Sequence, residues 1–514
     1  MPVIEAPGAV GKSVEKHKGS YDATRQFIGV LLLYFIVQII LRVWISPSVD
    51  LDESEQLVLT QKLSWGYGSQ PPLYTWIQFA FFKIFGLSVF ALSLLKNILL
   101  FCTYLLTYLN ARIITRRHAC AVAAAASLLF IPQVAWESQR DLTHSVLAST
   151  LISATLFCFL RLRIILCLRT YVLFGLCVGL TVLSKYNSAV TLLALGLAAI
   201  SLPGFRAIIL DKRMAVAGII ASLVILPNFL WALHHPELAL QSVGKLGIHE
   251  PGSWLVGVIS GFKRLLTSSI TFLGPLAIIY GILSWKSPAI APSKKSEYTT
   301  FLIRMLLISY GLILLTILIF RVTEIHDRWL QPILIYSPIF GITLLQHRLD
   351  SIRLKSILAI AAVVAIAVPV ALYGRIIWAE RLHRTQPWNR PYDALTEQLK
   401  PSLEPAAAVV TDTTLMAGNL RLNIPNKIFT PPELTSMFVQ TNNGFTLVWE
   451  AGDDAPSKSS ARNGPRYWPP PKNLVQFAEK AGLNLNPYRA QYFTAKFKYH
   501  QTRQMKVGVL APTK

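Results

Sequence analysis

The stretch FIGVLLLYFIVQIILRVWISPSVDLDESE, residues 27–55, joins a long apolar segment to four closely spaced carboxylates. A helix rising about 1.5 Å per residue needs roughly 20 apolar residues to cross the roughly 30 Å hydrocarbon core of a bilayer, and residues 27–45 match that length. They exceed the apolar region of a usual signal peptide, and no A-x-A cleavage site follows them. We therefore expect a retained first transmembrane helix followed by an acidic loop.

Similar apolar blocks recur along the chain. The 514 residues are 53% hydrophobic with a mean hydropathy of +0.47, which is more apolar than a soluble protein of this length. The blocks predict an all-α polytopic membrane domain with about eleven spans, at residues 27–45, 89–110, 118–134, 143–160, 171–184, 188–204, 214–232, 266–285, 300–320, 329–346 and 356–374.

The composition changes after residue 374, where Arg, Pro, Asn and Asp become frequent and no later apolar run could span a bilayer. We therefore divide the chain into an N-terminal tail (1–26), a transmembrane domain (27–374) and a small C-terminal α/β domain (375–514). Strands are expected at 407–411, 445–449, 492–499 and 506–510, helices at 394–400 and 474–481, and an exposed loop at 452–472.

The net charge of +23 invites a nucleic-acid interpretation, but much of the excess lies in alternate loops. Five such loops carry three basic residues each: Arg112, Arg116 and Arg117; Arg161, Arg163 and Arg169; Arg206, Lys212 and Arg213; Lys286, Lys294 and Lys295; Arg348, Arg353 and Lys355. This pattern places them in the cytoplasm together with the N-terminus. The sequence thus predicts a multi-pass protein of the bacterial inner membrane with a periplasmic C-terminal domain and no nucleic-acid partner; the basic tail suits acidic membrane lipids.

Polar residues gather in the loops that would face outward: 46–88, 135–142, 233–265 and 321–328. The first loop contains Asp50, Asp52, Glu53 and Glu55, followed by the aromatic segment WGYGSQPPLYTW at 65–76. A solvated loop edge and an interfacial aromatic belt are the simpler alternatives. Because few charges lie within the spans, we favour a site at the outer interface over a path through the bilayer.

The order of these features resembles a known family. Asp-Glu after the first helix, a segment ending in Pro-Pro-Leu-Tyr-x-Trp, an Asp opening the fourth helix and Leu-Ser-Lys-Tyr at the fifth are similar to the GT-C glycosyltransferases of family 39. That family includes protein mannosyltransferases, lipid A aminoarabinose transferases and rhizobial lipopolysaccharide galacturonosyltransferases. The resemblance covers about residues 25–345. It implies a GT-C membrane domain and inverting transfer of a sugar from a polyprenyl-phosphate donor to an anionic glycolipid acceptor, such as lipid A or lipopolysaccharide.

The resemblance also implies roles for three carboxylates. Asp52 fits the first-loop carboxylate of the family and would act as general base or orient the acceptor oxygen, with Glu53 beside it. Asp141 fits the second carboxylate. A negative charge at the start of the fourth helix is also stabilised by the helix dipole, so a purely structural role for Asp141 stays open.

Cations implied to bind the donor phosphate are Lys185, Arg328 and, in a loop that we expect to close over the donor, Lys245. Lys185 could instead extend toward the interface, and Arg328 could simply pair with nearby loop charges. Candidate substrate contacts are Tyr67, Gln70, Tyr74 and His326. Some relatives have a lysine directly before the first-loop prolines where this chain has Gln70, which argues against aminoarabinose as the sugar.

No cofactor is expected, although the sequence leaves a divalent metal open. The segment 233–265 contains several histidines and carboxylates without a recognised ligand spacing, and residues 50–52 spell D-x-D in a loop that should face away from cytoplasmic nucleotide sugars. Two other functions are weighed against the enzyme: a transporter or flippase of a lipid-linked sugar, and a non-catalytic envelope assembly protein.

Overall fold

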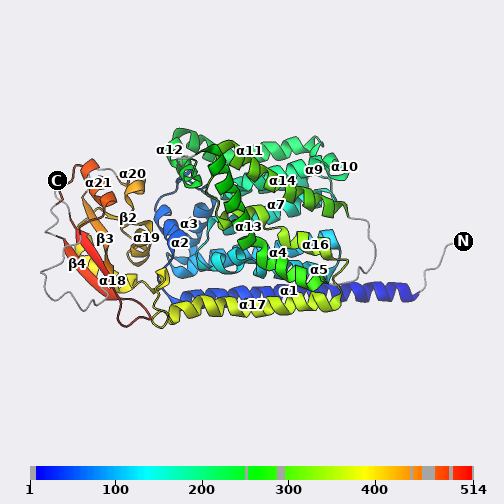
Figure 1. Cartoon of the computed structure of the whole chain (residues 1–514), viewed down its shortest axis with the longest axis horizontal. Helices are drawn as coiled ribbons and strands as arrows, with labels where there is room; N and C mark the ends of the chain where they lie inside the picture. The colour runs from blue at the N-terminus through cyan, green and yellow to red at the C-terminus, as the bar shows by residue number, and fades with distance from the viewer. Residues whose placement is uncertain are drawn as a thin grey trace.

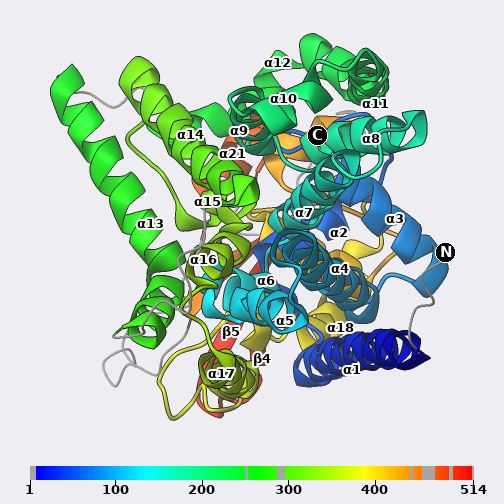
Figure 2. The ribbon, with the colours of Figure 1, turned by 90° about the vertical axis from the view of Figure 1, so that its right-hand side faces the viewer.

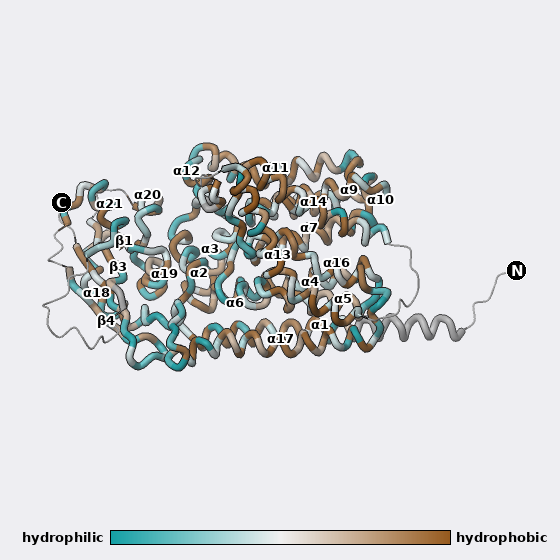
Figure 3. The backbone as a smooth tube through the Cα atoms, viewed as in Figure 1, coloured by the Kyte–Doolittle hydropathy of each residue, from teal (hydrophilic) through white to brown (hydrophobic). Residues whose placement is uncertain are grey.

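The computed structural model describes residues 7–248, 253–285, 296–439, 444–453, 469–485 and 490–511. Its helices form an elongated bundle, and a small domain with a β-sheet caps one end of the long axis, opposite the N-terminus (Figure 1). Apolar residues dominate the bundle, whereas polar residues are frequent in the end domain (Figure 3). The predicted combination of a helical membrane domain with a C-terminal sheet is confirmed.

Seven helices in the described part of the chain are long and apolar enough to span a membrane alone. They are residues 22–45 of α1 (Pro7–Ile45), α4 (Val89–Thr115), α7 (His144–Leu162), α11 (Arg213–His234), α13 (Trp254–Ser284), α14 (Glu297–Phe320) and α17 (Ser351–Ile377). The most apolar windows of α4 and α7 are 61% and 72% buried, against 28% or less in the other five. Accordingly α4 and α7 lie inside the bundle, while α1, α11, α13 and α17 lie at its periphery (Figure 2).

Two further spans would each be a bent pair of helices. α5 (His118–Ala126) continues through η1 (Ser127–Phe130) and turns by 76° into η2 (Gln133–Glu137) and α6 (Ser138–Arg140), while α9 (Ser188–Ile200) turns by 118° into α10 (Pro203–Ile209). Pro132 and Pro203 lie at these breaks, and the preceding residues, Ile131 and Leu202, are extended because proline disfavours the α conformation before it.

The remaining expected spans are shorter helices: α8 (Leu168–Ser184), and the pair α15 (Asp327–Leu334) and α16 (Ser337–Leu345). Length and composition thus support seven spans, or nine if each bent pair counts as one. The count of eleven stays a prediction.

Helices also occupy the segments expected as loops. Residues 46–88 contain α2 (Leu51–Leu59) and α3 (Leu73–Phe85), and the segment after α11 contains α12 (Pro236–Ala239) and η3 (Gln241–Leu246). The helix that contains the expected span at residues 266–285 starts earlier than that span: α13 begins at Trp254, where the side chain of Ser253 caps the helix by accepting from the Val256 amide.

The C-terminal domain contains a five-stranded sheet of order β2-β1-β3-β5-β4, formed by β1 (Ala408–Thr411), β2 (Ile428–Thr430), β3 (Phe445–Asp453), β4 (Gln491–Lys496) and β5 (Gln504–Leu510). β1 is parallel to β2 and β3, and β5 is antiparallel to β3 and β4. The helices of the domain are η4 (Pro387–Asn389), α18 (Tyr392–Leu403), α19 (Thr414–Asn423), η5 (Pro432–Leu434), α20 (Thr435–Phe438) and α21 (Lys472–Lys480). The four expected strands are confirmed, β2 and α19 were not expected, and residues 454–468 of the expected loop lie outside the described residues.

Helix α2 connects the membrane bundle to this domain. Val58 of α2 is fully buried in the hydrophobic cluster that contains Met416 and Leu420 of α19. The amide group of Asn419 accepts from the Val49 amide and donates to the Val49 carbonyl, at 2.9 and 3.1 Å. The position of α2 therefore depends on the C-terminal domain as well as on the bundle.

Candidate active site

The N-cap and the first turn of α2 carry three of the acidic residues. Asp50 caps the helix by accepting from the Leu51 amide, and the backbone amide of Asp52 donates to Oδ1 of Asp141 at 2.8 Å. Asp141 directly follows α6 and is 4% exposed. A carboxylate at a helix N-terminus satisfies an amide that has no partner within the helix and is stabilised by the helix dipole. Asp141 therefore anchors the start of α2, whereas α7, the fourth helix of the sequence analysis, begins only at His144.

Glu53 is buried between two cations. Its carboxylate accepts from Lys96 Nζ at 2.7 Å and from the Arg42 guanidinium at 3.0 Å, and the three side chains are at most 3% exposed. Burial raises the pKa of the Glu53 carboxyl, but the two cations outweigh this effect and lower it overall. Arg42 also donates to the carbonyls of Ser46 and Ser48 and stacks on the Trp388 ring at 4.2 Å. This ion triad joins α1, α4 and α2.

Asp50 is also paired with a cation. Its Oδ2 accepts from Arg140 at 2.6 Å, and Arg140 also pairs with Glu137 at 2.8 Å. Asp50 and Glu53 thus neutralise cations of neighbouring helices, while Asp52, between them in sequence, is left facing open space.

That space is a cavity of about 440 Å³, which we call the cationic cavity. Asp52, Lys185 and Arg328 all line it, although they are far apart in sequence. Lys185 follows α8 immediately, is 8% exposed and donates to Ser145 Oγ at 2.6 Å. Arg328 is on the first turn of α15, which is held near this site because Asn187 donates to the Trp329 carbonyl at 2.8 Å.

The charges in this cavity shift one another's pKa. Burial raises the pKa of Asp52 and the cations Arg328 and Lys185 oppose that rise. Burial lowers the pKa of Lys185 to about 8, with Asp52 acting in the opposite direction. Asp141 has its pKa raised by burial and by the nearby charges of Asp52 and Asp50. A carboxylate of raised basicity beside two cations is suited to accept a proton next to a bound anion.

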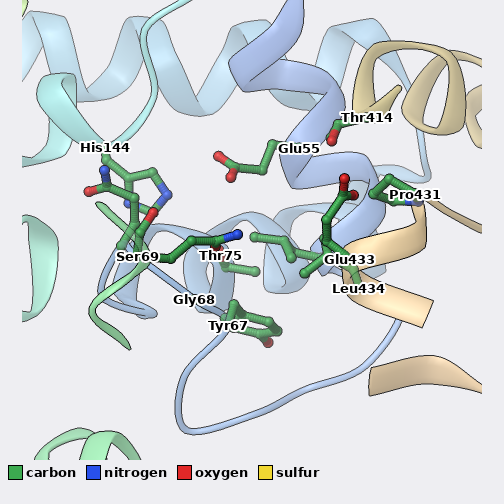
Figure 4. Close-up of a pocket in the computed structure, with 13 residues that line it drawn as sticks. Glu55, Tyr67, Gly68, Ser69, Thr75, His144, Thr414, Pro431, Glu433 and Leu434 are labelled. Carbon is green, nitrogen blue, oxygen red and sulfur yellow. The ribbon is translucent and has the colours of Figure 1, made fainter. Parts of the chain in front are cut away.

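A second cavity of about 290 Å³ adjoins the first, and we call it the acidic cavity. Glu55, Ser69, Gln70, His144 and Thr414 line both cavities, so the two are neighbouring parts of one site. In the close-up view Glu55 lies between His144 on one side and Glu433 and Pro431 on the other (Figure 4). The C-terminal domain therefore forms part of this wall.

Hydrogen bonds orient the amide group of Gln56 toward His144. Thr75 donates to Gln56 Oε1 at 2.8 Å, which leaves the amide nitrogen of Gln56 to donate to His144 Nε2 at 3.2 Å. With the Gln56 amide oriented in this way, the Nε2 atom of His144 is the acceptor of this hydrogen bond.

The four predicted substrate contacts differ in whether they line the cavities. Gln70 lines both cavities and Tyr67 lines the acidic one, with its hydroxyl accepting from the Ser64 amide and donating to the Lys62 carbonyl. Tyr74 is fully buried beneath the site, 5.5 Å from the His144 ring. His326 is exposed and is not among the cavity-lining residues; its ring packs edge-on against Trp329.

The segment expected to close over the donor also contacts the site. Leu246 lines the cationic cavity, and its carbonyl accepts from the Thr323 amide at 3.1 Å, so η3 docks on the 321–328 segment. Lys245 lies within η3, but its side chain is outside the described part of the structure.

Within the described residues, no group of three or more His, Cys, Asp or Glu side chains is arranged to hold a metal ion. The Nδ1 atoms of His234 and His235 contact the carbonyls of Leu230 and Trp231 in their own helix, at 2.7 and 3.0 Å. His249 and Glu250, which belong to the same 233–265 segment, lie outside the described residues.

Several site residues were missed from the sequence. Arg42 and Lys96 lie within otherwise apolar helices, and a charge within a span is itself a signal of function. The sequence shows that such charges are few, but it does not show that these two meet at Glu53. His144 was hidden because the fourth span was expected to begin at residue 143. Thr414 and Glu433 had no signal at all, since nothing in the sequence shows which part of the C-terminal domain meets the bundle.

Known proteins resemble the chain in sequence. Residues 69–231 match the family model for dolichyl-phosphate-mannose-protein mannosyltransferases. The chain is 36% identical over 399 residues to the lipopolysaccharide core galacturonosyltransferase RgtB of Rhizobium johnstonii, covering 77% of this chain and 81% of that protein. It is 30% identical over 429 residues to RgtA of the same organism, covering 82% and 85%.

Solved structures resemble it in fold. ArnT from Cupriavidus metallidurans in the apo state superposes with a TM-score of 0.59 at 14% identity, over 95% of this chain and 98% of that one. The same protein bound to undecaprenyl phosphate gives a TM-score of 0.57 at 13% identity, over 94% and 97%. With two relatives at this level of identity across more than four fifths of their length, the chain belongs to the GT-C membrane glycosyltransferase family that contains the lipopolysaccharide core galacturonosyltransferases of Rhizobium.

Proposed function

We propose that this glycosyltransferase moves a sugar from a polyprenyl-phosphate donor to a hydroxyl group of a cell-envelope glycolipid, at the periplasmic face of the inner membrane. The observation that carries the proposal is that Asp52, Lys185 and Arg328 line one cavity. A base and two cations are what displacement of a phosphate by a hydroxyl group needs.

The two cations would hold the donor phosphate. Lys185 offers a point charge from the end of α8, and Arg328 offers a planar group that can bind two phosphate oxygens at once. The leaving polyprenyl phosphate is already a stable anion, so it requires no proton from the enzyme. ArnT, which shares the fold, has been solved bound to undecaprenyl phosphate, and this supports a lipid-linked donor here.

Asp52 would act as general base. As the acceptor oxygen attacks C1 of the sugar, its proton passes to the Asp52 carboxylate and a new C1–O bond forms. The bond from C1 to the phosphate oxygen breaks, and its electron pair leaves with the polyprenyl phosphate. Attack from the side opposite the phosphate inverts the anomeric centre. Glu53 and Asp141 would serve as positioning residues, since the first is held by two cations and the second binds the Asp52 amide.

The names of the two relatives suggest the sugar and the acceptor. Both are lipopolysaccharide core galacturonosyltransferases, so we propose a hexuronic acid as the transferred sugar and the lipopolysaccharide core as the acceptor. Gln70, which replaces a lysine of the aminoarabinose transferases, lines both cavities and fits this choice.

Mass spectrometry of the envelope glycolipids tests the proposal. Cells carrying Asp52→Asn at the native protein level should lose one hexuronic acid from a single lipopolysaccharide species, because the amide cannot accept the proton. Asp211→Asn, at a residue that pairs with Arg213 far from both cavities, is the matched control and should leave the profile unchanged. An unaltered profile with Asp52→Asn would contradict the proposal and return attention to a flippase.

A further inference from the structure

The short segment 133–141, which consists of η2, α6 and Asp141, contacts both helices that carry the proposed chemistry. Its first turn, η2, is a π-helix, a rare conformation that is frequent at functional sites. At the end of the segment Asp141 accepts from the Asp52 amide on α2 at 2.8 Å. At its start the Gln133 amide donates to Oδ2 of Asp327 on α15 at 2.7 Å. The same segment therefore bears on the base and on the residue that precedes Arg328.

Asp327 links Gln133 to Arg328. Its second carboxylate oxygen, Oδ1, accepts from the backbone amide of Arg328 at 2.7 Å. The carboxylate thus bridges the two residues, with one oxygen toward Gln133 and the other on the first turn of α15. Arg328 itself is exposed and lines the cationic cavity. The reach of a long exposed side chain depends on the backbone that carries it, so this bridge helps to decide where the guanidinium lies.

The amide group of Gln133 serves this one contact. The side chain is 1% exposed, and among the described residues its Oε1 atom has no hydrogen-bond partner. Burial of an amide whose hydrogen bonds are only partly made costs free energy, and an apolar side chain of the same size would pack without that cost. A role in packing alone therefore does not account for a glutamine at this position.

A separate contact holds the body of α15. Ser138 Oγ donates to the Gln133 carbonyl at 2.7 Å and is contacted by Gln331 Nε2 at 3.2 Å. Gln331 is fully buried and also donates to Ser149 Oγ of α7 at 3.2 Å. These bonds do not involve the side chain of Gln133. Its loss should therefore leave α15 in place and release only the turn that carries Arg328.

We propose that Gln133 is a positioning residue for donor binding, which acts through Asp327 to fix the backbone of Arg328 and so holds this cation in a set place relative to Asp52. The inference rests on the proposed function for the identity of the anion that Arg328 meets. Gln133 is not among the described residues that line either cavity, so its effect has to pass through Arg328 and not through direct contact with the donor.

Binding of a lipid phosphate is measured first, because it needs no turnover. Full-length protein in detergent micelles is titrated with undecaprenyl phosphate, and the lipid-bound fraction is followed by native mass spectrometry. Gln133→Met keeps the approximate size of the side chain and removes the amide, and it should weaken binding about fivefold or more because a charge-assisted hydrogen bond is lost. Arg328→Gln should weaken binding as well. Adding Gln133→Met to Arg328→Gln should weaken it no further, since residues that act in one chain of contacts are not additive.

Gln139→Met is the matched control. Gln139 lies in the same segment, is 4% exposed and donates to Asn97 Oδ1 of α4 at 3.0 Å. The variant removes a buried hydrogen bond of the same kind from a residue that does not contact α15, so the midpoint of thermal unfolding should fall as in Gln133→Met. Binding of undecaprenyl phosphate should stay within about twofold of the wild type.

A reversed pair tests the contact itself. Gln133→Glu replaces the donor by an acceptor and sets a second carboxylate against Asp327, so binding should fall at least as far as in Gln133→Met. Gln133→Glu combined with Asp327→Asn restores a donor opposite the new acceptor and keeps an oxygen for the Arg328 amide. Binding should then recover, which a general loss of stability would not allow.

Wild-type binding in Gln133→Met, equal weakening in Gln139→Met, or a further loss when Gln133→Met is added to Arg328→Gln would each overturn the inference.

Transfer separates the inference from the proposed function. With a polyprenyl-phosphate-linked sugar and lipopolysaccharide from the Asp52→Asn strain, Gln133→Met should raise the KM for the donor about fivefold or more and leave the KM for the acceptor unchanged. Transfer with an unaltered donor KM would refute the role of Gln133 but keep the proposed function. Weaker binding of undecaprenyl phosphate in Gln133→Met, with no transfer by the wild type, would refute the proposed function but keep the role of Gln133.

Discussion

At the residue scale, Lys185 connects the electrostatics of the site to a measurable pH dependence. Its ammonium must be charged to attract the donor phosphate, and its pKa is lowered to about 8 by burial. The Asp52 carboxyl must be deprotonated to act as base, and its pKa is raised by burial. Activity therefore requires a pH above the raised pKa of Asp52 and below that of Lys185.

The profile of kcat/KM against pH should accordingly be bell-shaped, with its basic limb near pH 8. Below this value Lys185 is charged, and above it donor capture falls as the amine becomes neutral. In Lys185→Arg the basic limb should disappear from the accessible range, because a guanidinium stays charged to about pH 12 or higher. The measurement is transfer by reconstituted protein between pH 5 and pH 10, with saturating acceptor. A basic limb that persists at the same pH in Lys185→Arg would assign it to another group.

Glu53 gives a second prediction at this scale. Because its carboxylate is buried between Arg42 and Lys96, Glu53→Gln leaves two buried cations without their counter-charge. Removing one partner of a buried ion pair costs about 3–5 kcal/mol, and the effect should appear as a lower midpoint of thermal unfolding together with lost transfer.

Asp393→Asn, which breaks a half-exposed pair with Lys498, is the matched control and should cost less than about 1 kcal/mol. If Glu53→Gln unfolded at the wild-type temperature yet lost all transfer, Glu53 would have a direct part in the chemistry and not the positioning role assigned to it here.

At the element scale, the contact between α2 and α19 controls where Asp52 lies. Gly418 of α19 packs against Ser54 so closely that an added Cβ would lie 2.5 Å from the Ser54 backbone. Gly418→Ala should therefore force the two helices apart, destabilise the protein by about 1–3 kcal/mol and reduce kcat by misplacing Asp52.

Gly196→Ala, at a helical glycine of α9 with open space around it, is the control. It should retain activity and gain slightly in stability, since alanine favours helix more than glycine does. Thermal unfolding and single-turnover transfer, measured on both variants, separate the two effects. Wild-type kcat in Gly418→Ala would show that the position of α2 does not depend on this contact.

The same element shows what the sequence could and could not reveal. The apolar blocks predicted a helical membrane domain, and the four carboxylates after the first block marked the segment that contains α2. The apolar residues of α2 are too few to predict a helix from the sequence alone. Val58 packs against residues of α19, which are distant in the sequence. The bends at Pro132 and Pro203 could not be predicted from hydropathy, because hydropathy gives the length of an apolar run and not the direction of its helix axis.

At the scale of the whole molecule, the residues of the site converge from segments that no local pattern connects. Lys185 and Arg328 come from the ends of bundle helices, Asp52 from a short helix above them and Glu433 from the C-terminal domain. The sequence allowed Lys185, Arg328 and Asp52 each to be placed near the end of a predicted helix or in a predicted loop. Their meeting in two adjoining cavities depends on tertiary packing, which hydropathy and motif order do not encode.

The long axis of the molecule separates two kinds of surface. The C-terminal domain and α2 lie at one end, and α10, which contains Arg206 and is followed by Lys212 and Arg213, lies toward the other end (Figure 1). Because basic loops stay in the cytoplasm, we expect both cavities to open on the periplasmic side. A lipid-linked donor fits that side, where nucleotide sugars are absent.

Labelling of single cysteines tests this orientation. The described chain contains five free cysteines, Cys102, Cys120, Cys158, Cys167 and Cys177, which would first be replaced by alanine with transfer confirmed to persist. Lys480 and Lys212 are both exposed and lie respectively in the C-terminal domain and beside α10. A membrane-impermeant maleimide should modify Lys480→Cys in intact spheroplasts and Lys212→Cys only after lysis. The reverse pattern would place the cavities in the cytoplasm, where Asp50-Leu51-Asp52 and a nucleotide-sugar donor would have to be reconsidered.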